Sequence, residues 1–546
     1  MFGAGGGTSS YKEVEETDLI ILWGSNARDT HPIFFHHVLR GIHHGAKLYA
    51  VDPRRTGTSA WADLWLGIDV GSDIALANAM AREIIHAGLA NMEFIENATT
   101  GFEEFRKTVE TYTLERAEKL TGVPAAAIRQ LAHAYGRADR AMICWTLGIT
   151  EHHNAVDNVL ALINLALLTG HVGRYGSGLN PLRGQNNVQG GGDMGAIPNK
   201  LPGFQDVEDP AIRARFEHAW GIPSGTIPSV KGRHLSQMFE AMEHGEMTSL
   251  YVIGENPAQS EADQNRAVHL LSSLEHLVVQ DVFMTKTAEL AHVVLPAAAG
   301  WCESEGTVTN SERRVQRVRK ALEPPDGARD DVDIITALAH RLGAGWSYEK
   351  AEEVWEECRS LSPMHAGMSY RRLEELGGIQ WPCADENDPG SLFLHGRLWQ
   401  RPIEGPPAPF TAVEDDPPVE KLSPEFPLRL TTGRRLDSYN TGVQTGGYTS
   451  PLRKQEYLQI SPEDAHTLGV VEGEVVKASS RRGAVEVAVH VDSTLRPGLV
   501  FMTLHFPDQV ATNLLTIDAL DPKSGTAEFK ASAIRIDKVP AGVPTG

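Results

Sequence analysis

The stretch DLIILWGSN, residues 18–26, decides the fold class. Its unbroken apolar run, bounded by turn-forming residues, is typical of a strand that is buried on both faces. A helical stretch over 33–44 follows, and then a second strand over 47–52. A strand, a helix and a strand in this order predict a right-handed βαβ unit within a parallel sheet. A third strand over 64–67 and a long helix near Asp73 extend this unit.

The same plan returns further along the chain. Strands are predicted over 250–254, 277–281 and 292–295, with a helix over 264–276. The residues that recur at matching spacing are Gly24, Asn26, Asp52 and Thr58 in the first copy and Gly254, Asn256, Asp281 and Thr287 in the second. This internal duplication predicts two similar ligands, or one ligand with two similar arms.

The C-terminal part changes character. A proline-rich stretch between Pro402 and Pro427 is typical of a linker or a long surface connection. Beyond it, short β-branched runs over 428–538 are broken by glycines, which predicts a small β-barrel. One helix is expected there, because Ser461 and Pro462 make a favourable helix start.

The predicted fold class is therefore α/β, with two related Rossmann-like parallel-sheet domains and a C-terminal barrel. A length of 546 residues also predicts about three or four domains. The predicted boundaries are 1–185 for the first α/β domain, 186–345 for the second, 346–425 for a helical segment with the proline-rich linker, and 426–546 for the barrel.

Composition excludes several classes of protein. Apolar residues make up 41% of the chain and charged residues 22%, which excludes wholesale disorder. The formal net charge of −21 argues against a nucleic-acid partner or an anionic membrane surface. No stretch is long and apolar enough for a membrane span, and we expect a cytoplasmic protein. None of the four cysteines forms a Cys-x-x-Cys pair, which argues against a disulfide scaffold or a self-contained iron–sulfur site.

Two turns follow the first strands of the two copies, at the sheet edge where ligands bind in open parallel folds. Neither turn contains Gly-x-Gly-x-x-Gly, so an NAD-binding dehydrogenase is not expected on this chain. Asp52 and Asp281, which end the second strands, could each accept from a ribose hydroxyl or from the N–H edge of a guanine. Taken singly, Asp52 or Asp281 could merely cap a helix or lie in a solvated loop. Because the turn and the acid recur together in both copies, we favour ligand binding.

The segment RGQNNVQGGGDM, residues 183–194, is the strongest short signal for a substrate site. Its amides offer paired donors and acceptors, and the planar guanidinium of Arg183 fits a carboxylate. The glycines of the segment are also compatible with a flexible surface loop that binds no substrate. We interpret the segment as a site for a small anionic substrate.

Other polar features carry less weight. We interpret the stretch 307–314 as a solvated charged turn, and the histidine doublets at 36–37, 43–44 and 152–153 as helix surface. No His-Glu-x-x-His pattern accompanies the doublets, so no metal ligand is assigned to this chain.

With these features the sequence resembles the catalytic subunit of molybdopterin-dependent formate dehydrogenases, within the molybdopterin oxidoreductase family. The resemblance covers nearly the whole chain. Its most specific element is RGQNNVQG at 183–190, which in that family marks formate dehydrogenases. It is supported by WGSNARDTHP at 23–32, VDPRRT at 51–56, GENPAQSEAD at 254–263 and ALDPKSGTAEFK at 519–530.

The resemblance implies a molybdenum or tungsten bis(molybdopterin guanine dinucleotide) cofactor, with one dinucleotide arm in each half and a double-psi barrel over the pterins. The implied residues of the first half are Gly24, Asn26, Asp29, Asp52, Arg54, Gly71, Asp73, Gly148 and Thr150. Those of the second half are Asn256, Ser260, Gln280, Asp281 and Asp331. Those of the barrel are Gly433, Arg434, Asn513 and Lys530. Glu151 stands where the family usually has Gln, and Asn440 where it often has His.

The implied reaction is the oxidation of formate to CO2, or its reverse. Arg183 would hold the formate carboxylate and orient its C–H bond toward the metal, and Gln185 would line the same pocket. The cofactor supplies the redox chemistry and the protein positions it.

The chain departs from the family pattern at its start. The family carries a Cys or Sec metal ligand followed by His, and an N-terminal cysteine cluster for a [4Fe-4S] centre, and neither is in this sequence. We expect a missing N-terminal portion, lost through an in-frame UGA codon, a split gene or a partial sequence. Without that portion the chain is expected not to turn over formate.

The expected partners are formate, the missing N-terminal portion and an electron-accepting subunit, which is an NAD-reducing flavoprotein, a ferredoxin or a hydrogenase. Two alternatives stay open here, namely another substrate of the same family and a non-catalytic scaffold subunit of the same fold.

Overall fold

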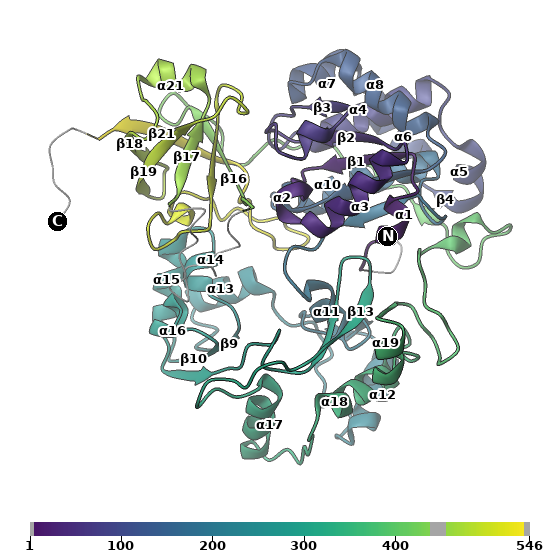
Figure 1. Cartoon of the computed structure of the whole chain (residues 1–546), viewed down its shortest axis with the longest axis vertical. Coiled ribbons are helices and arrows are strands. Elements are labelled where there is room, and N and C mark those ends of the chain that lie inside the picture. The colour runs from purple at the N-terminus through teal and green to yellow at the C-terminus, as the bar shows by residue number, and fades with distance from the viewer. Residues whose placement is uncertain (1–4, 437–454, 540–546) are drawn as a thin grey trace.

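The computed structural model describes residues 5–436 and 455–539. In Figure 1 the first α/β domain lies at the upper right and the barrel at the upper left, with the second sheet and its neighbours below them. The first described residues lie beside the first domain, and the last described strand lies at the far side of the barrel. The predicted fold class is confirmed, because the structure has two parallel sheets and a closed barrel.

The first sheet has five parallel strands in the order β3-β2-β1-β5-β6. Their bounds are β1 Leu19–Trp23, β2 Lys47–Val51, β3 Leu64–Leu66, β5 Ala141–Trp145 and β6 Gly178–Pro181. The helices of this domain are α1 Tyr11–Val14, α2 Ala27–Thr30, α3 Pro32–His43, α4 Asp73–His86, α5 Met92–Ala98, α6 Phe102–Glu110, α7 Leu114–Thr121, α8 Ala125–Arg137, α9 Leu147–Thr150 and α10 Ala155–Thr169.

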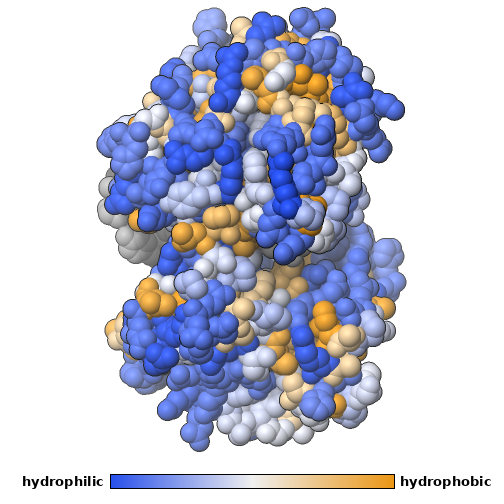
Figure 2. All heavy atoms as spheres, turned by 90° about the vertical axis from the view of Figure 1, so that its right-hand side faces the viewer, coloured by the Kyte–Doolittle hydropathy of each residue, from blue (hydrophilic) through white to orange (hydrophobic). Residues whose placement is uncertain are grey.

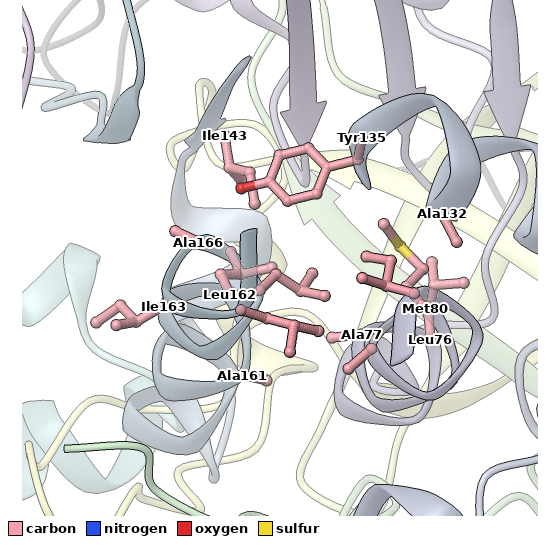
Figure 3. Packing of buried hydrophobic residues seen from close by; sticks show 14 of the residues in the cluster. Leu76, Ala77, Met80, Ala132, Tyr135, Ile143, Ala161, Leu162, Ile163 and Ala166 are labelled. Carbon is pink, nitrogen blue, oxygen red and sulfur yellow. The ribbon is translucent and has the colours of Figure 1, made fainter. Parts of the chain in front are cut away.

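Alternate residues of β1 point to opposite faces of the sheet. Ile21 packs into the larger core with α4, α8 and α10, whereas Ile20 packs into a smaller core with α1 and α3. Figure 3 shows the larger core, where Met80 of α4, Tyr135 of α8 and Leu162 of α10 converge. Because both faces are covered, β1 is apolar throughout, which explains its unbroken run of apolar residues.

The second sheet repeats the strand order of the first. Its parallel strands β9 Ser249–Ile253, β10 His276–Asp281 and β11 Val293–Pro296 lie in the order β11-β10-β9, which matches β3-β2-β1. The helices α13 Leu235–Glu243, α14 Pro257–Ser260, α15 Gln264–Ser272 and α16 Lys286–Glu289 belong to this half. The predicted duplication is thus present in the topology.

A further group of elements lies below the first domain and to the right of the second sheet in Figure 1. It contains an antiparallel hairpin that pairs with a third short strand. Its elements are α11 Val188–Asp193, α12 Pro210–Trp220, β12 Gly306–Thr309, β13 Arg314–Val318, α17 Asp331–Arg341, α18 Ala351–Leu361, α19 Tyr370–Glu375 and β14 Ile379–Gln380, with the short pair β7 Lys200–Leu201 and β8 Gln205–Asp206.

The barrel closes in the strand order β16-β20-β17-β19-β18-β21. Its elements are β16 Leu428–Gly433, β17 Tyr457–Ile460, α21 Pro462–Leu468, β18 Val475–Ser479, β19 Ala484–Val491, β20 Leu499–Thr503 and β21 Ser532–Lys538. Ser461 caps α21 as expected, because its hydroxyl accepts from the backbone N–H of Asp464 at 3.0 Å.

The proline-rich connection runs along the first domain. Its strand β15 Ala408–Pro409 pairs with β4 Thr99–Thr100, and Phe410 and Val413 are buried in the core of that domain. On the face shown in Figure 2, hydrophilic residues predominate and hydrophobic residues gather in small groups, one of them at the waist of the molecule. Within 5–436 and 455–539, no helix has both the length and the apolar character that a membrane crossing needs.

Candidate functional site

One cavity lies where the carboxyl edge of the first sheet faces the barrel. It holds about 880 Å³ of empty space, part of its open mouth included. The turn after β1, the end of β2, the start of α4, the short helix α9 and strand β16 all contribute to its lining. Ten residues that the resemblance assigned to the cofactor line this cavity, namely Gly24, Asn26, Asp52, Arg54, Gly71, Asp73, Gly148, Gly433, Arg434 and Lys530.

Two glycines form a bare stretch of backbone in this lining. Gly24 has φ +57°, and its carbonyl accepts from the N–H of Gly148 at 3.2 Å and from the Thr146 hydroxyl at 2.7 Å. A Cβ added to Gly148 would lie 2.4 Å from the Gly24 oxygen. Neither position tolerates a side chain, so a ligand can approach the backbone closely here.

Buried charges of both signs face the cavity. Arg54 packs its guanidinium 3.5 Å from the centre of the Phe501 ring in the barrel. Burial lowers the pKa of Arg54, and burial raises the pKa of Asp52, although the charge and backbone N–H of Arg54 oppose that rise. Asp73 accepts from the indole N–H of Trp23 at 2.8 Å, and burial raises its pKa. A diphosphate or a guanine edge would compensate these buried charges.

Lys530 of the cavity lining forms an ion pair with Glu151, with 2.6 Å between Nζ and Oε2. Lys530 also donates to the carbonyl of Thr432 at 3.0 Å. The glutamate that departs from the family pattern therefore engages a lysine that the resemblance assigned to the cofactor. Thr150 ends α9, one residue before Glu151, and is half-buried.

The doublet at 152–153 was predicted to be helix surface, and that prediction was wrong. His152 lines the cavity and is 2% exposed. His153 hydrogen-bonds Glu528 at 2.9 Å and Asp416 at 3.0 Å. Burial would raise the pKa of Glu528, but its contacts with His152 and His153 lower it to about 2. The local spacing could not reveal this environment, because the covering residues lie hundreds of positions later. The other two doublets were predicted correctly: the doublet at 36–37 lies on the solvent side of α3, and the doublet at 43–44 lies at its exposed C-terminal end.

The duplicated turns share one hydrogen-bond pattern. Asn26 Oδ1 accepts from the Thr58 hydroxyl at 3.0 Å, and the Thr58 oxygen accepts from a backbone N–H of α2 at 2.9 Å. Asn256 Oδ1 accepts from the Thr287 hydroxyl at 2.7 Å, and the Thr287 oxygen accepts from a backbone N–H of α14 at 3.0 Å. Asn26 also donates to Asp29 at 2.8 Å, which explains the place of Asp29 beside the cavity.

The residues assigned to the second half gather at the carboxyl edge of the second sheet, outside the cavity lining. Asp281 ends β10, and the amide of its neighbour Gln280 donates to Asp331 at the start of α17. Burial raises the pKa of both aspartates. Asn513 of the barrel donates to the carbonyl of Ser260 at 3.0 Å, which ties the barrel to this half. Asn440 lies outside the described residues.

Arg183 lies between two residues of the cavity lining, Leu182 and Gly184. Its Nη2 donates to the carbonyl of Gly5 at 2.8 Å, and its Nε to Gln189 at 3.2 Å. Within the described part of the chain, its Nη1 makes no hydrogen bond. Burial lowers the pKa of this guanidinium. Gln185, two residues on, is exposed.

His31 was missed by the sequence analysis as a site residue. It lines the cavity, and its Nε2 lies 2.7 Å from the carbonyl oxygen of Arg183. Burial lowers its pKa, although the hydrogen bond to Arg183 opposes this. Its position in WGSNARDTHP, directly before Pro32 at the start of α3, was the available signal.

Two polar segments are more ordered than predicted. Part of the glycine-rich segment forms α11, in which Gln189 and Asp193 are buried. The stretch 307–314 belongs to the β12–β13 hairpin, not to a solvated turn. Arg313 at its tip is fully buried and donates to the carbonyl of Gly7 at 2.7 Å. Groups distant in sequence hold these side chains: backbone carbonyls accept from Gln189 and Arg313, and the indole N–H of Trp381 donates to Asp193. No local sequence pattern predicts these contacts.

The family description "Molybdopterin oxidoreductase" matches residues 4–341 of this chain, which is more than half of it. The chain belongs to the molybdopterin oxidoreductase family. A second description, "Molydopterin dinucleotide binding domain", matches residues 428–533, which include the barrel strands from β16 to β20. As predicted, the cofactor of this molybdopterin oxidoreductase is a molybdenum or tungsten bis(molybdopterin guanine dinucleotide).

Named relatives of this molybdopterin oxidoreductase align along nearly its whole length. F420-dependent formate dehydrogenase 2 subunit alpha of Methanococcus maripaludis is 42% identical over 545 residues, which are 98% of this chain and 79% of the relative. Formate dehydrogenase H of Escherichia coli is 38% identical over 542 residues, 98% of this chain and 75% of the relative. The solved structure of acetylene hydratase from Pelobacter acetylenicus has a TM-score of 0.75 at 20% identity, over 98% of this chain and 79% of that chain, and shows the same fold.

The cavity fits such a cofactor. Its bare glycine backbone admits a flat ring system, and Arg54, Arg434 and Lys530 offer positive charge to phosphates. The buried carboxylate of Asp52 can accept from the N–H edge of a guanine. The described residues contain no group of three or more His, Cys, Asp or Glu that could hold a metal ion.

Proposed function

We propose that this chain is the catalytic part of an enzyme that oxidises formate to CO2, or runs the reverse reaction, at its molybdopterin centre. The observation that carries the proposal is the half-buried Arg183, whose sequence neighbours Leu182 and Gly184 line the cavity and whose Nη1 is uncommitted among the described residues. A carboxylate is the natural partner of such a group. Relatives whose names contain formate dehydrogenase align over 98% of the chain, which supports the choice of substrate.

The cofactor contacts follow from the two halves. The residues that line the cavity would hold one dinucleotide arm, and Asn256, Ser260, Gln280, Asp281 and Asp331 would hold the other. Arg54, Arg434 and Lys530 would face phosphates or pterin oxygens, and Asn513 would fix the barrel beside the second arm. The predicted domain boundaries remain part of this proposal.

In the reaction, formate loses the hydrogen of its C–H bond as one proton and two electrons, or as a hydride, and CO2 remains. The bound cofactor supplies the acceptor for the two electrons. Arg183 binds the carboxylate through Nη1 by a charge-assisted hydrogen bond, which contributes about 1.5–3 kcal/mol. Because Nε and Nη2 are held by the protein, the bound formate has a fixed orientation. Gln185, which the resemblance also assigned to the formate pocket, is exposed and would contact formate only from the outer side.

The proposal includes further subunits and a compartment. Several relatives are named as subunits alpha of F420-dependent enzymes, which supports an electron-accepting partner for this chain. We place it in the cytoplasm, because all four cysteines are free thiols, as is usual in a reducing compartment. Pull-down with the chain as bait and cell fractionation test these two statements.

The Arg183→Lys variant of the molybdenum-loaded holoenzyme tests the role of Arg183. Lysine keeps the charge but loses the planar fork, so kcat/KM for formate should fall about 10- to 100-fold. The control is Arg137→Lys, at an exposed arginine that ends α8, and it should behave as wild type. Unchanged formate kinetics in Arg183→Lys, at equal molybdenum content, would contradict the proposed role.

A further inference from the structure

Behind Arg183 lies a chain of buried polar side chains that the reaction itself does not use. Gln189 Oε1 accepts from Arg183 Nε at 3.2 Å. The Gln189 amide nitrogen donates to Asp193 Oδ1 at 2.8 Å and to the carbonyl of Gly5 at 3.2 Å. Asp193 Oδ2 accepts from the indole N–H of Trp381 at 2.7 Å. Gln189 is 3% exposed and Asp193 is 1% exposed.

The partners of Gln189 leave its amide only one orientation. Both acceptors, the Asp193 carboxylate and the Gly5 carbonyl, must face the NH2 group. The carbonyl oxygen of Gln189 must therefore face Arg183. The Gly5 carbonyl also accepts from Arg183 Nη2, so the guanidinium is held along one edge by two acceptors. Nη1, at the opposite corner, is left for a ligand.

Asp193 fixes this arrangement from one turn further along α11. Gln189 and Asp193 are four residues apart, so they lie on the same face of that helix. A carboxylate suits the place, because both of its neighbours, Gln189 and Trp381, are donors. A side-chain amide would turn its own NH2 toward one of these donors and lose that hydrogen bond.

We propose that Gln189 and Asp193 are positioning residues that fix the orientation of the Arg183 guanidinium toward its anionic ligand. The identity of that anion as formate rests on the proposed function, whereas the orientation of Arg183 does not. The two residues act through Arg183 and do not touch the substrate.

The first test is the Gln189→Met variant, which keeps the length of the side chain and removes its hydrogen bonds. In the holoenzyme the KM for formate should rise about tenfold or more, a loss of about 1.4 kcal/mol in binding, with kcat changed less than about threefold. The Gln237→Met control removes a hydrogen-bonded helical glutamine on α13 and should leave KM unchanged. A wild-type KM in Gln189→Met would overturn the proposal.

The second test is the Asp193→Asn variant, which keeps the shape of the side chain and serves also if Gln189→Met folds poorly. Burial raises the pKa of Asp193 to about 6, although Gln189, Trp381 and the charged groups Arg183 and Arg313 oppose that rise. Wild-type kcat/KM should therefore rise as the pH passes 6, and Asp193→Asn should lack that rise and keep a high KM. The same pH profile in both enzymes would contradict the role of Asp193.

The third test follows Arg183 directly and needs no turnover. Phenylglyoxal modifies accessible arginines, and peptide mass spectrometry reports the rate at Arg183. That rate should increase several-fold in Gln189→Met but not in Gln237→Met, and equal rates would overturn the positioning role. If the wild-type holoenzyme does not oxidise formate but the labelling rate still increases, the proposed function fails and the positioning role stands.

Discussion

At the scale of single residues, Gly24 in the turn after β1 and Gly148 in the turn after β5 lie so close together that neither has space for a side chain. A methyl group at position 148 would lie 2.4 Å from the Gly24 oxygen, and a backbone atom cannot move aside as a flexible side chain can. Because both residues are glycines, the two turns can approach each other closely, and the backbone is exposed to the cavity. The resemblance had assigned both glycines to the cofactor, but their mutual contact was not readable from the sequence.

The Gly148→Ala variant should therefore lose stability and cofactor together. We expect a loss of about 1–3 kcal/mol in the free energy of unfolding, together with substoichiometric molybdenum after purification. Chemical denaturation and metal analysis measure the two effects. Gly345→Ala, at a loop glycine with nothing within 4 Å of an added Cβ, serves as control. Full molybdenum content in Gly148→Ala would refute the role of this contact in cofactor binding.

At the scale of elements, the segment from α9 to the start of α10 docks onto the chain just before β21. Four ion pairs join the two segments, namely Glu151 with Lys530, His152 with Glu528, His153 with Glu528, and Asp157 with Lys523. The first three are largely buried and the fourth is more exposed, so the first three carry most of the docking energy.

The Glu528 pair gives a prediction for stability against pH. Glu528 has a pKa of about 2 in the folded protein against an ordinary 4.5, so its contribution is fully present above pH 4.5 and is lost as the pH falls toward 2. His153 has a raised pKa, so its contribution is fully present below pH 6.5 and is lost as the pH rises through that raised value. Glu528→Gln should cost on the order of 3 kcal/mol at pH 6 and much less at pH 3. Denaturation curves at both pH values measure this, and an equal loss at both would contradict it.

Elements with a strong local signal were predictable from the sequence. The apolar run of β1, the repeated Gly-x-Asn turns and the Ser461 cap lie where they were expected. Helix α11 was not foreseen, because three glycines in a row oppose a helix, and distant contacts of Gln189 and Asp193 hold it. The residues assigned by the resemblance lie in recognisable sequence motifs, so they could be named before the structure. The role of His31 and the burial of His152 depend on contacts with residues far away in the sequence, so they could not.

At the scale of the whole molecule, the cavity is shared between the first α/β domain and the barrel. A ligand that contacts both sides binds the closed arrangement and not the unfolded chain, so it stabilises the molecule by mass action. We expect the molybdenum-loaded protein to unfold at a higher temperature than the cofactor-free protein. A ligand present at 100 times its Kd gives about 2.7 kcal/mol. Calorimetry of the two forms measures this, and trypsin should cut the 402–427 connection faster in the cofactor-free form. Equal unfolding temperatures would show that the cofactor does not join the two parts.

The central claim is that this molybdopterin oxidoreductase acts on formate. The most direct measurement follows 13C-formate with the purified, molybdenum-loaded holoenzyme, with the expected N-terminal portion supplied, and a viologen dye as electron acceptor. The account predicts one 13CO2 for every two electrons that appear in the dye, with the rate sharply reduced in Arg183→Lys. A fully loaded holoenzyme that reduces no dye with formate, or a rate that does not depend on Arg183, would contradict it.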